Sequence, residues 1–122
     1  MVAAAVILKK NIDGLKDSKK LNQNQRKKFS KIIIENSYFA YGSASEKEID
    51  QTNILQATMK GMHLCIDDIR KNHTIDTLLI DGNHFKIYTD ENLECIDHEC
   101  VISGDNTYKS IAAASILAKT YR

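Results

Sequence analysis

The chain has 122 residues, of which 43% are hydrophobic and 27% are charged, and this composition is typical of one globular domain. Seventeen Lys and Arg residues against 16 Asp and Glu residues give a formal net charge of +1, so only a local basic patch could attract a polyanion. Three cysteines, with no apolar leader and no membrane-spanning run, predict free thiols in a reducing, cytoplasmic compartment.

An apolar run opens the chain at positions 2–8, with the sequence VAAAVIL. This run predicts a strand that is covered on both faces, as is typical of an internal strand of a sheet. An internal strand needs a neighbour along each edge, so we expect a further strand upstream of Val2.

Cations and a hydroxyl gather in the loop at positions 15–21, LKDSKKL. A loop of this kind is suited to contacts with phosphate groups, and Lys19 and Lys20 would carry the charge. By composition alone, an ordinary solvated loop is the more common interpretation.

The next segments carry the signals of a helix and a strand. Asn22 and Gln25 have the spacing of a capping box and predict a helix over residues 23–35, with one apolar face and one basic face. Aromatic and small residues predict a strand over residues 38–44.

A second capping box, Ser45 with Glu48, opens a helical region that is predicted to extend to Arg70. Apolar residues recur through this region at helical spacing, and we interpret them as core. They are Leu55, Met59, Met62, Ile66 and Ile69.

Residues 77–80, TLLI, predict a strand that is buried on both faces and runs directly into Asp81 and Gly82. A carboxylate at the end of a rigid strand is well placed to hold a divalent cation. The alternative is that Asp81 caps a turn by accepting a hydrogen bond from a nearby backbone amide, and this segment alone favours that alternative.

Cys95, His98 and Cys100 lie within six residues, but a zinc site would need a fourth ligand at a matching spacing. A simpler interpretation is a polar loop over residues 84–94 and a strand over residues 98–102. That second strand leads to an aspartate, Asp105. Alanine-rich residues 110–119 then predict a helix that packs closely on a sheet.

Two aspartates that each follow a strand suit metal-dependent phosphoryl transfer, although two carboxylates are too few to hold two metal ions. At this point the chain resembles a known family, ribonuclease HII, over nearly its whole length. The matching segments occur in the family's order and are residues 2–8, 14–21 (GLKDSKKL), 48–50 with 53–59, 80–83 (IDGN) and 104–105 with 111–119.

The resemblance implies a ribonuclease H-like α/β fold, a mixed sheet flanked by helices. It also implies an endonuclease that cleaves the RNA strand of RNA–DNA hybrids and cuts at ribonucleotides embedded in DNA. Four acidic side chains would hold Mg or Mn, and Asp81 matches the third of them and Asp105 the fourth. The full-length protein is expected to be monomeric, with no membrane contact. Expected nucleic-acid contacts are Asp17, Ser18, Lys19, Lys20, Asn83 and Lys119.

The chain departs from the family's pattern at both ends. The family's first two acids form an Asp-Glu pair on a strand that would precede Val2, followed by a Gly-Arg-Gly loop, and neither motif occurs here. The family also continues beyond Arg122 with further substrate contacts, including a tyrosine. Residues 84–100 are longer and poorer in proline than the usual connection. We therefore interpret residues 1–122 as a partial catalytic domain, lacking the first strand and the C-terminal helices and inactive alone.

Two other functions remain open from the sequence. The chain could be a catalytically dead module that binds a partner, or nucleic acid through Lys19, Lys20, Lys27 and Lys28. It could also be another nuclease or an integrase of the same superfamily. The DSKKL segment at positions 17–21 is specific to ribonuclease HII and argues against the last of these.

Overall fold

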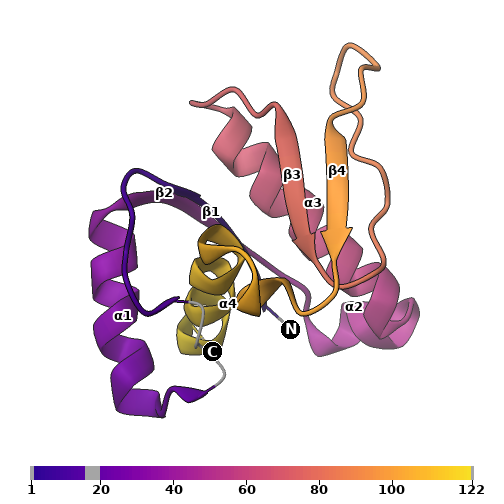
Figure 1. The fold of residues 1–122 in the computed structure, drawn as a ribbon. Coiled ribbons are helices and arrows are strands. Elements are labelled where there is room, and N and C mark those ends of the chain that lie inside the picture. Colours follow the sequence, from indigo (N-terminus) through magenta and orange to yellow (C-terminus); the bar gives the residue numbers. More distant parts are fainter. Residues whose placement is uncertain (1, 16–19, 122) are drawn as a thin grey trace.

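The computed structural model describes residues 2–15 and 20–121 (Figure 1). The predicted α/β class is confirmed, and most predicted elements end within one or two residues of the observed ones. The elements are β1 (Val2–Leu8), α1 (Gln23–Glu35), β2 (Ser37–Ser43), α2 (Glu46–Gln51), α3 (Ile54–Arg70), β3 (Thr77–Asp81), β4 (Asp97–Val101), the 3-10 helix η2 (Gly104–Asn106) and α4 (Lys109–Tyr121). Within the described ranges, no helix combines the length and the apolar character needed to span a membrane.

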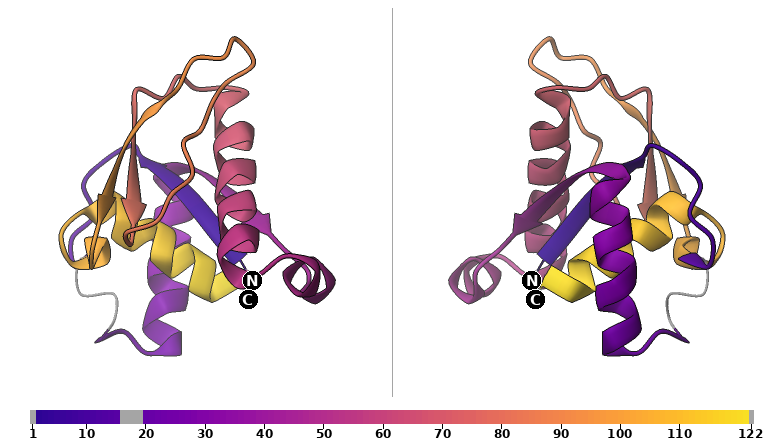
Figure 2. Two further views of the ribbon diagram at one scale, coloured as in Figure 1. Left: turned by 90° about the vertical axis from the view of Figure 1, so that its right-hand side faces the viewer. Right: turned by 90° about the vertical axis from the view of Figure 1, so that its left-hand side faces the viewer.

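The antiparallel pair of β1 and β2 lies between helices on both faces (Figure 2). Successive residues of a strand point to opposite faces, so the apolar run of β1 supplies two cores at once. On one face, Ala3 and Ala40 pack with Cys65 and Ile69 of α3. On the other face, α1 and α4 close a second core that consists of Ile12, Leu15, Ile33, Ala112, Ala113, Ile116 and Leu117.

The parallel pair of β3 and β4 forms a separate two-stranded sheet within the described residues. The prediction that residues 77–80 are covered on both faces is wrong, because Leu79 is 36% exposed and only Ile80 of the strand is buried. The edge of β3 that faces away from β4 adjoins a groove instead of another strand. The described strands therefore form two separate two-stranded sheets.

The helical region predicted up to Arg70 is confirmed, and it consists of two helices, α2 and α3. Ser45 caps α2 by accepting a hydrogen bond from the Glu48 amide at 3.2 Å. Asn53 then caps α3 by accepting one from the Gln56 amide at 2.8 Å. Because a short polar side chain competes for backbone amides, Asn53 favours a new helix start over a helix interior.

The N-terminal end of the predicted apolar stripe lies outside the core. Ile66 and Ile69 are buried, but Leu55 is 48% exposed. Leu55 borders a surface hollow that Met59 and Phe85 also line. The helical period alone could not reveal this, because the first turn of α3 faces the connection after β3 instead of the sheet.

The connection between β3 and β4 is irregular, as predicted, but it is fastened to α3. His63 Nε2 lies 2.8 Å from the Lys86 carbonyl oxygen, and Tyr88 donates a hydrogen bond to Asp67. Arg70 Nη1 donates to the Tyr88 hydroxyl at 3.1 Å. The connection therefore packs as a structured excursion along one helix.

Candidate functional site

Asp81 lies where β3 ends, beside the turn that follows β4. In the parallel register Asp81 is opposite Val101, so both strands end at the same edge of their sheet. The backbone amide of Gly104 donates a hydrogen bond to Asp81 Oδ1 at 3.1 Å. Asp105 directly follows Gly104 in the chain, so the fold brings the two predicted site aspartates, Asp81 and Asp105, near each other.

Asp105 does not itself end a strand, and that part of the prediction is wrong. β4 ends at Val101, and Ser103 adopts a left-handed conformation with φ 55° before η2 begins. The short 3-10 helix buries Asp105, which is 2% exposed. Packing of η2 against α4 and β3, rather than the direction of a strand, determines where this carboxylate lies.

The surroundings of Asp81 are compatible with both of its predicted roles, as a capping residue and as a ligand of a cation. Oδ1 accepts a backbone amide hydrogen bond, as the capping interpretation predicted, although the donor is 23 positions away. The residue as a whole is exposed, so its other carboxylate oxygen can face solvent.

The donor chemistry fits a hard cation such as Mg²⁺ or Mn²⁺. Mg²⁺ is commonly held by one or two carboxylates together with water and substrate phosphates. Asp81 and Asp105 would supply the two carboxylates. No group of three or more His, Cys, Asp or Glu residues is gathered for a metal within the described part of the chain. Cys95, His98 and Cys100 therefore do not come together as such a group.

The predicted nucleic-acid residues are distributed over several elements. Lys20, Asn83 and Lys119 are exposed, and Asn83 follows Asp81 by two positions. Lys119 borders the same groove as Asp81. The other expected contacts lie outside the described residues and are Asp17, Ser18 and Lys19.

Lys109 is a residue near the site that the sequence analysis did not identify. Its Nζ donates a hydrogen bond to Asn11 Oδ1 and lies 3.7 Å from Asp13 Oδ1. These contacts fasten the segment before the cationic loop to the first residue of α4, four positions after Asp105. The contact to Asn11 spans 98 positions, so no local sequence signal could have indicated it.

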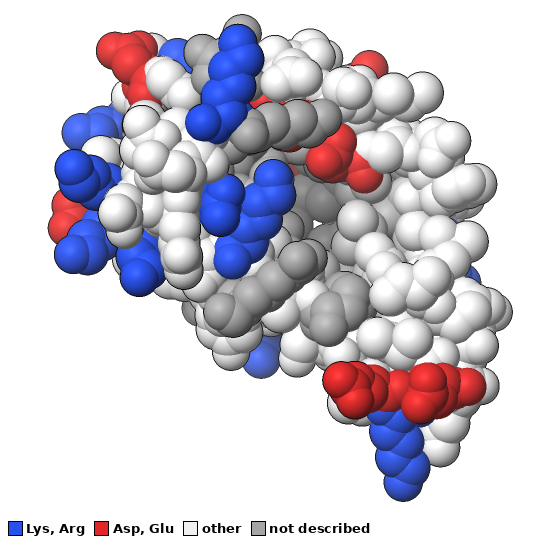
Figure 3. All heavy atoms as spheres, turned by 90° about the horizontal axis from the view of Figure 1, so that it is seen from below, with Lys and Arg blue, Asp and Glu red and all other residues white. Residues whose placement is uncertain are grey.

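Basic side chains also occupy the exposed face of α1. Lys27, Lys28 and Lys31 are exposed, and the helix contains one acidic residue, Glu35. Figure 3 shows Lys and Arg gathered toward the α1 side of the molecule, around a hollowed surface with acidic side chains at its rim. A local basic patch therefore exists although the whole chain is nearly neutral.

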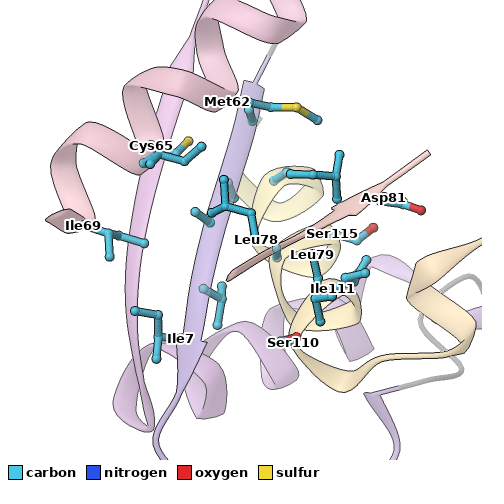
Figure 4. Close-up of a pocket in the computed structure, with 18 of the residues that line it drawn as sticks. Ile7, Met62, Cys65, Ile69, Leu78, Leu79, Asp81, Ser110, Ile111 and Ser115 are labelled. Carbon is cyan, nitrogen blue, oxygen red and sulfur yellow. The ribbon is translucent and has the colours of Figure 1, made fainter. Parts of the chain in front are cut away.

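A groove of about 400 Å³ separates β1 from β3 (Figure 4). Residues 2–7 of β1 and residues 77–81 of β3 border it without a gap. Consecutive residues of a strand can border one space only if the edge of the strand faces it, because a face would present every second residue. Apolar side chains of α3 and α4 close the two sides, among them Met62, Cys65, Ile69 and Ile111.

Comparison of the fold defines its class. The structure described as the PCNA:RNase HII complex from Archaeoglobus fulgidus contains a chain that superposes with a TM-score of 0.72 at 23% sequence identity. The match covers 99% of this chain and 63% of that one. The architecture is therefore a partial ribonuclease H-like fold.

Sequence comparison identifies the family. A family model described as Ribonuclease HII matches residues 1–122, so the chain belongs to the ribonuclease HII family. Ribonuclease HII of Cytophaga hutchinsonii is 47% identical over 100% of this chain and 59% of its own length. Ribonuclease HII of Bacteroides fragilis is 48% identical over 98% of this chain and 58% of its own length. The chain thus spans somewhat more than half the length of these relatives.

Proposed function

We propose that the chain supplies the middle part of a ribonuclease HII catalytic domain. The complete enzyme would cleave the RNA strand of RNA–DNA hybrids, and cut at ribonucleotides embedded in DNA, by metal-assisted hydrolysis. The observation that carries the proposal is the hydrogen bond from the Gly104 amide to Asp81 at 3.1 Å, in a chain that belongs to this family. The complete protein would act as a monomer in the cytoplasm.

Asp81 and Asp105 are the residues that would hold Mg²⁺ or Mn²⁺. When bound, the cation orients an attacking water and stabilises the leaving oxygen of the phosphodiester. The chain's own contribution is to position the ligands. Asp81 lies on the end of a strand, and Asp105 is 2% exposed in a packed turn, so neither has to be ordered when substrate arrives.

Lys20, Asn83 and Lys119 would contact the substrate backbone together with the loop at positions 17–19. Phosphate contacts set the register of a duplex on a protein, and here they would place the scissile bond over Asp81. Binding that depends on such contacts weakens as salt is added.

The chain alone would be inactive. Asp81 and Asp105 would be two of the four acidic ligands that the resemblance implies, so this chain would supply only part of the site that holds the cation. The groove between β1 and β3 is suited to a further strand, because it offers two strand edges and two apolar helix walls. A strand from outside residues 1–122 that paired there would join the two sheets.

The test compares this chain with a version extended at both ends to the length of the relatives. Each is assayed with Mn²⁺ or Mg²⁺ on a duplex that carries one ribonucleotide. We expect incision only by the extended version, with loss of incision in Asp81→Asn. Asp76→Asn is the matched control, because Asp76 is an exposed aspartate that precedes the same strand. Robust metal-dependent incision by the 122-residue chain would show that the ligand set is wrong.

The exposed lysines of α1 favour a second candidate, a module that binds nucleic acid without cutting it. Under this alternative the extended version would still bind an RNA–DNA duplex, but neither metal nor Asp81 would matter. Replacing Lys27 and Lys28 by Ala would then reduce binding more than replacing Lys20. Comparing duplex binding by the two sets of lysine variants, together with incision by Asp81→Asn, separates the two candidates.

A further inference from the structure

We propose that Gly104 is a positioning residue for the metal site: its amide holds Oδ1 of Asp81 so that Oδ2 is turned toward the cation. The inference rests on the proposed function, since it assigns a role within the same site. It goes beyond that function by naming a residue with no side chain as the group that orients a ligand.

The donor is fixed from several directions. Gly104 is buried at the start of η2, and its carbonyl oxygen accepts hydrogen bonds from the amides of Thr107 at 3.0 Å and Tyr108 at 2.8 Å. The Gly104 N–H shares its peptide unit with the Ser103 carbonyl, and this carbonyl oxygen accepts a hydrogen bond from the Asn106 amide at 3.0 Å. The amide that faces Asp81 therefore belongs to a turn that internal hydrogen bonds hold in place.

A side chain on residue 104 would crowd Ile111 of α4. A Cβ atom on residue 104 would lie 2.7 Å from Ile111 Cδ1 and 3.3 Å from Ile111 Cγ2. Ile111 is buried in α4, so the contact could be relieved only by moving that side chain or the turn. The absence of a side chain allows η2 to pack on α4 while its amide reaches Asp81.

The hydrogen bond from the Gly104 amide would orient the Asp81 carboxylate, as hydrogen bonds from outside the ligand set orient the ligands of many metal sites. A donor on one oxygen restricts rotation of the carboxylate about its Cβ–Cγ bond, and the other oxygen is left in a defined direction. Such contacts typically contribute about 10- to 100-fold to metal affinity when the ligand itself is unchanged. Because Gly104 precedes Asp105, the same short turn sets the separation of the two ligands.

The sharpest test removes only the N–H group. A thioester of residues 1–99 is ligated at Cys100 to a synthetic segment of residues 100–122 in which Gly104 is replaced by glycolic acid, so that an ester oxygen stands where the amide was. The recombinant segment carries ¹³C label, and broadening of the Asp81 carboxyl signal by added Mn²⁺ reports binding without any activity assay. The matched control places lactic acid at Ala112, which removes the helix hydrogen bond from the Ala112 amide to the Tyr108 carbonyl.

We expect the ester at position 104 to require about tenfold more Mn²⁺ for the same broadening, and the ester at position 112 to require no more than the unmodified chain. Selective broadening of Asp81 that is the same in both esters would overturn the positioning role and leave the metal site in place. Failure of Mn²⁺ to broaden Asp81 in the unmodified chain would overturn the metal site, and the positioning role with it.

A recombinant pair decides the matter if the ester disturbs folding. Gly104→Ala should weaken Mn²⁺ binding by displacing the turn, and adding Ile111→Val, which removes the Cδ1 atom, should restore part of the loss. Ile111→Val alone should bind Mn²⁺ as the parent chain does. Equal Mn²⁺ binding by Gly104→Ala and the parent would contradict the inference.

Discussion

The backbones of Gly42 and Gly61 touch directly where β2 crosses α3. A Cβ atom on Gly42 would lie 2.1 Å from the Gly61 carbonyl oxygen and 3.1 Å from Cys65 Sγ. A backbone oxygen cannot move aside as the end of a side chain can. Gly42→Ala should therefore lower the free energy of unfolding by about 1–3 kcal/mol, measured by urea denaturation.

Gly82 provides the comparison for this prediction. A Cβ there would meet nothing within 4 Å, but the residue has φ +114°, so Gly82→Ala would cost stability through backbone strain alone. Because β2 lies so close to α3 at Gly42, we expect Gly42→Ala to lose near-UV circular dichroism from the aromatic residues of β2. Gly82→Ala should keep this signal. Unchanged stability of Gly42→Ala would show that the strand and helix are not in contact.

Removing the hydroxyl of Tyr88 should loosen the excursion that follows β3. The hydroxyl donates to Asp67 and accepts from Arg70, and the residue is 4% exposed. Tyr88→Phe keeps the ring but loses both bonds, so we expect a loss of about 1–2 kcal/mol and faster proteolysis within residues 84–96. Tyr38→Phe is the control, since Tyr38 is 42% exposed, and it should leave the proteolysis rate unchanged.

The stability of the chain should fall in alkaline solution because of Cys65. Burial raises the pKa of the Cys65 thiol to about 11, with a smaller contribution from the charge of Asp68. In the unfolded chain a cysteine thiol has a pKa of about 8.5. Between these values the unfolded state releases a proton that the folded state keeps, so the free energy of unfolding decreases as pH rises.

Urea denaturation at pH 8, 9 and 10 measures this effect. Cys65→Ala should be less stable at pH 8 because it leaves a small cavity, but its stability should depend less on pH. A thiol reagent at neutral pH should modify exposed Cys95 first and Cys65 only after unfolding. An identical pH dependence in Cys65→Ala would assign the effect to other groups.

Loss of the capping box at the start of α1 should destabilise the chain modestly. Asn22 Oδ1 accepts from the Gln25 amide, and Gln25 Oε1 accepts from the Asn22 amide, each at 2.9 Å. Asn22→Ala leaves one of these amides without its partner and should cost about 1 kcal/mol, measured as a shift of the thermal midpoint. Asn24→Ala removes the same type of side chain from an exposed helical position two residues further on, and it should not destabilise.

Local signals in the sequence determined most of the elements. The reciprocal spacing of Asn22 and Gln25, the apolar run of β1 and the alanines of α4 each act within a few positions, and the structure confirms all three elements. The strand that ends in Asp81 was predicted on the same basis. Backbone propensity and capping depend on neighbours along the chain, so such features can be identified without a fold.

Only the tertiary structure decided how these elements meet. The donor to Asp81 lies 23 positions away, and the partner of Lys109 lies 98 positions away. The break before α3 and the exposure of Leu55 and Leu79 likewise depend on what packs, or does not pack, against each face. The free energy of such contacts comes from burial and from hydrogen bonds between distant segments. Their geometry therefore exists only once the helices and strands are placed in space.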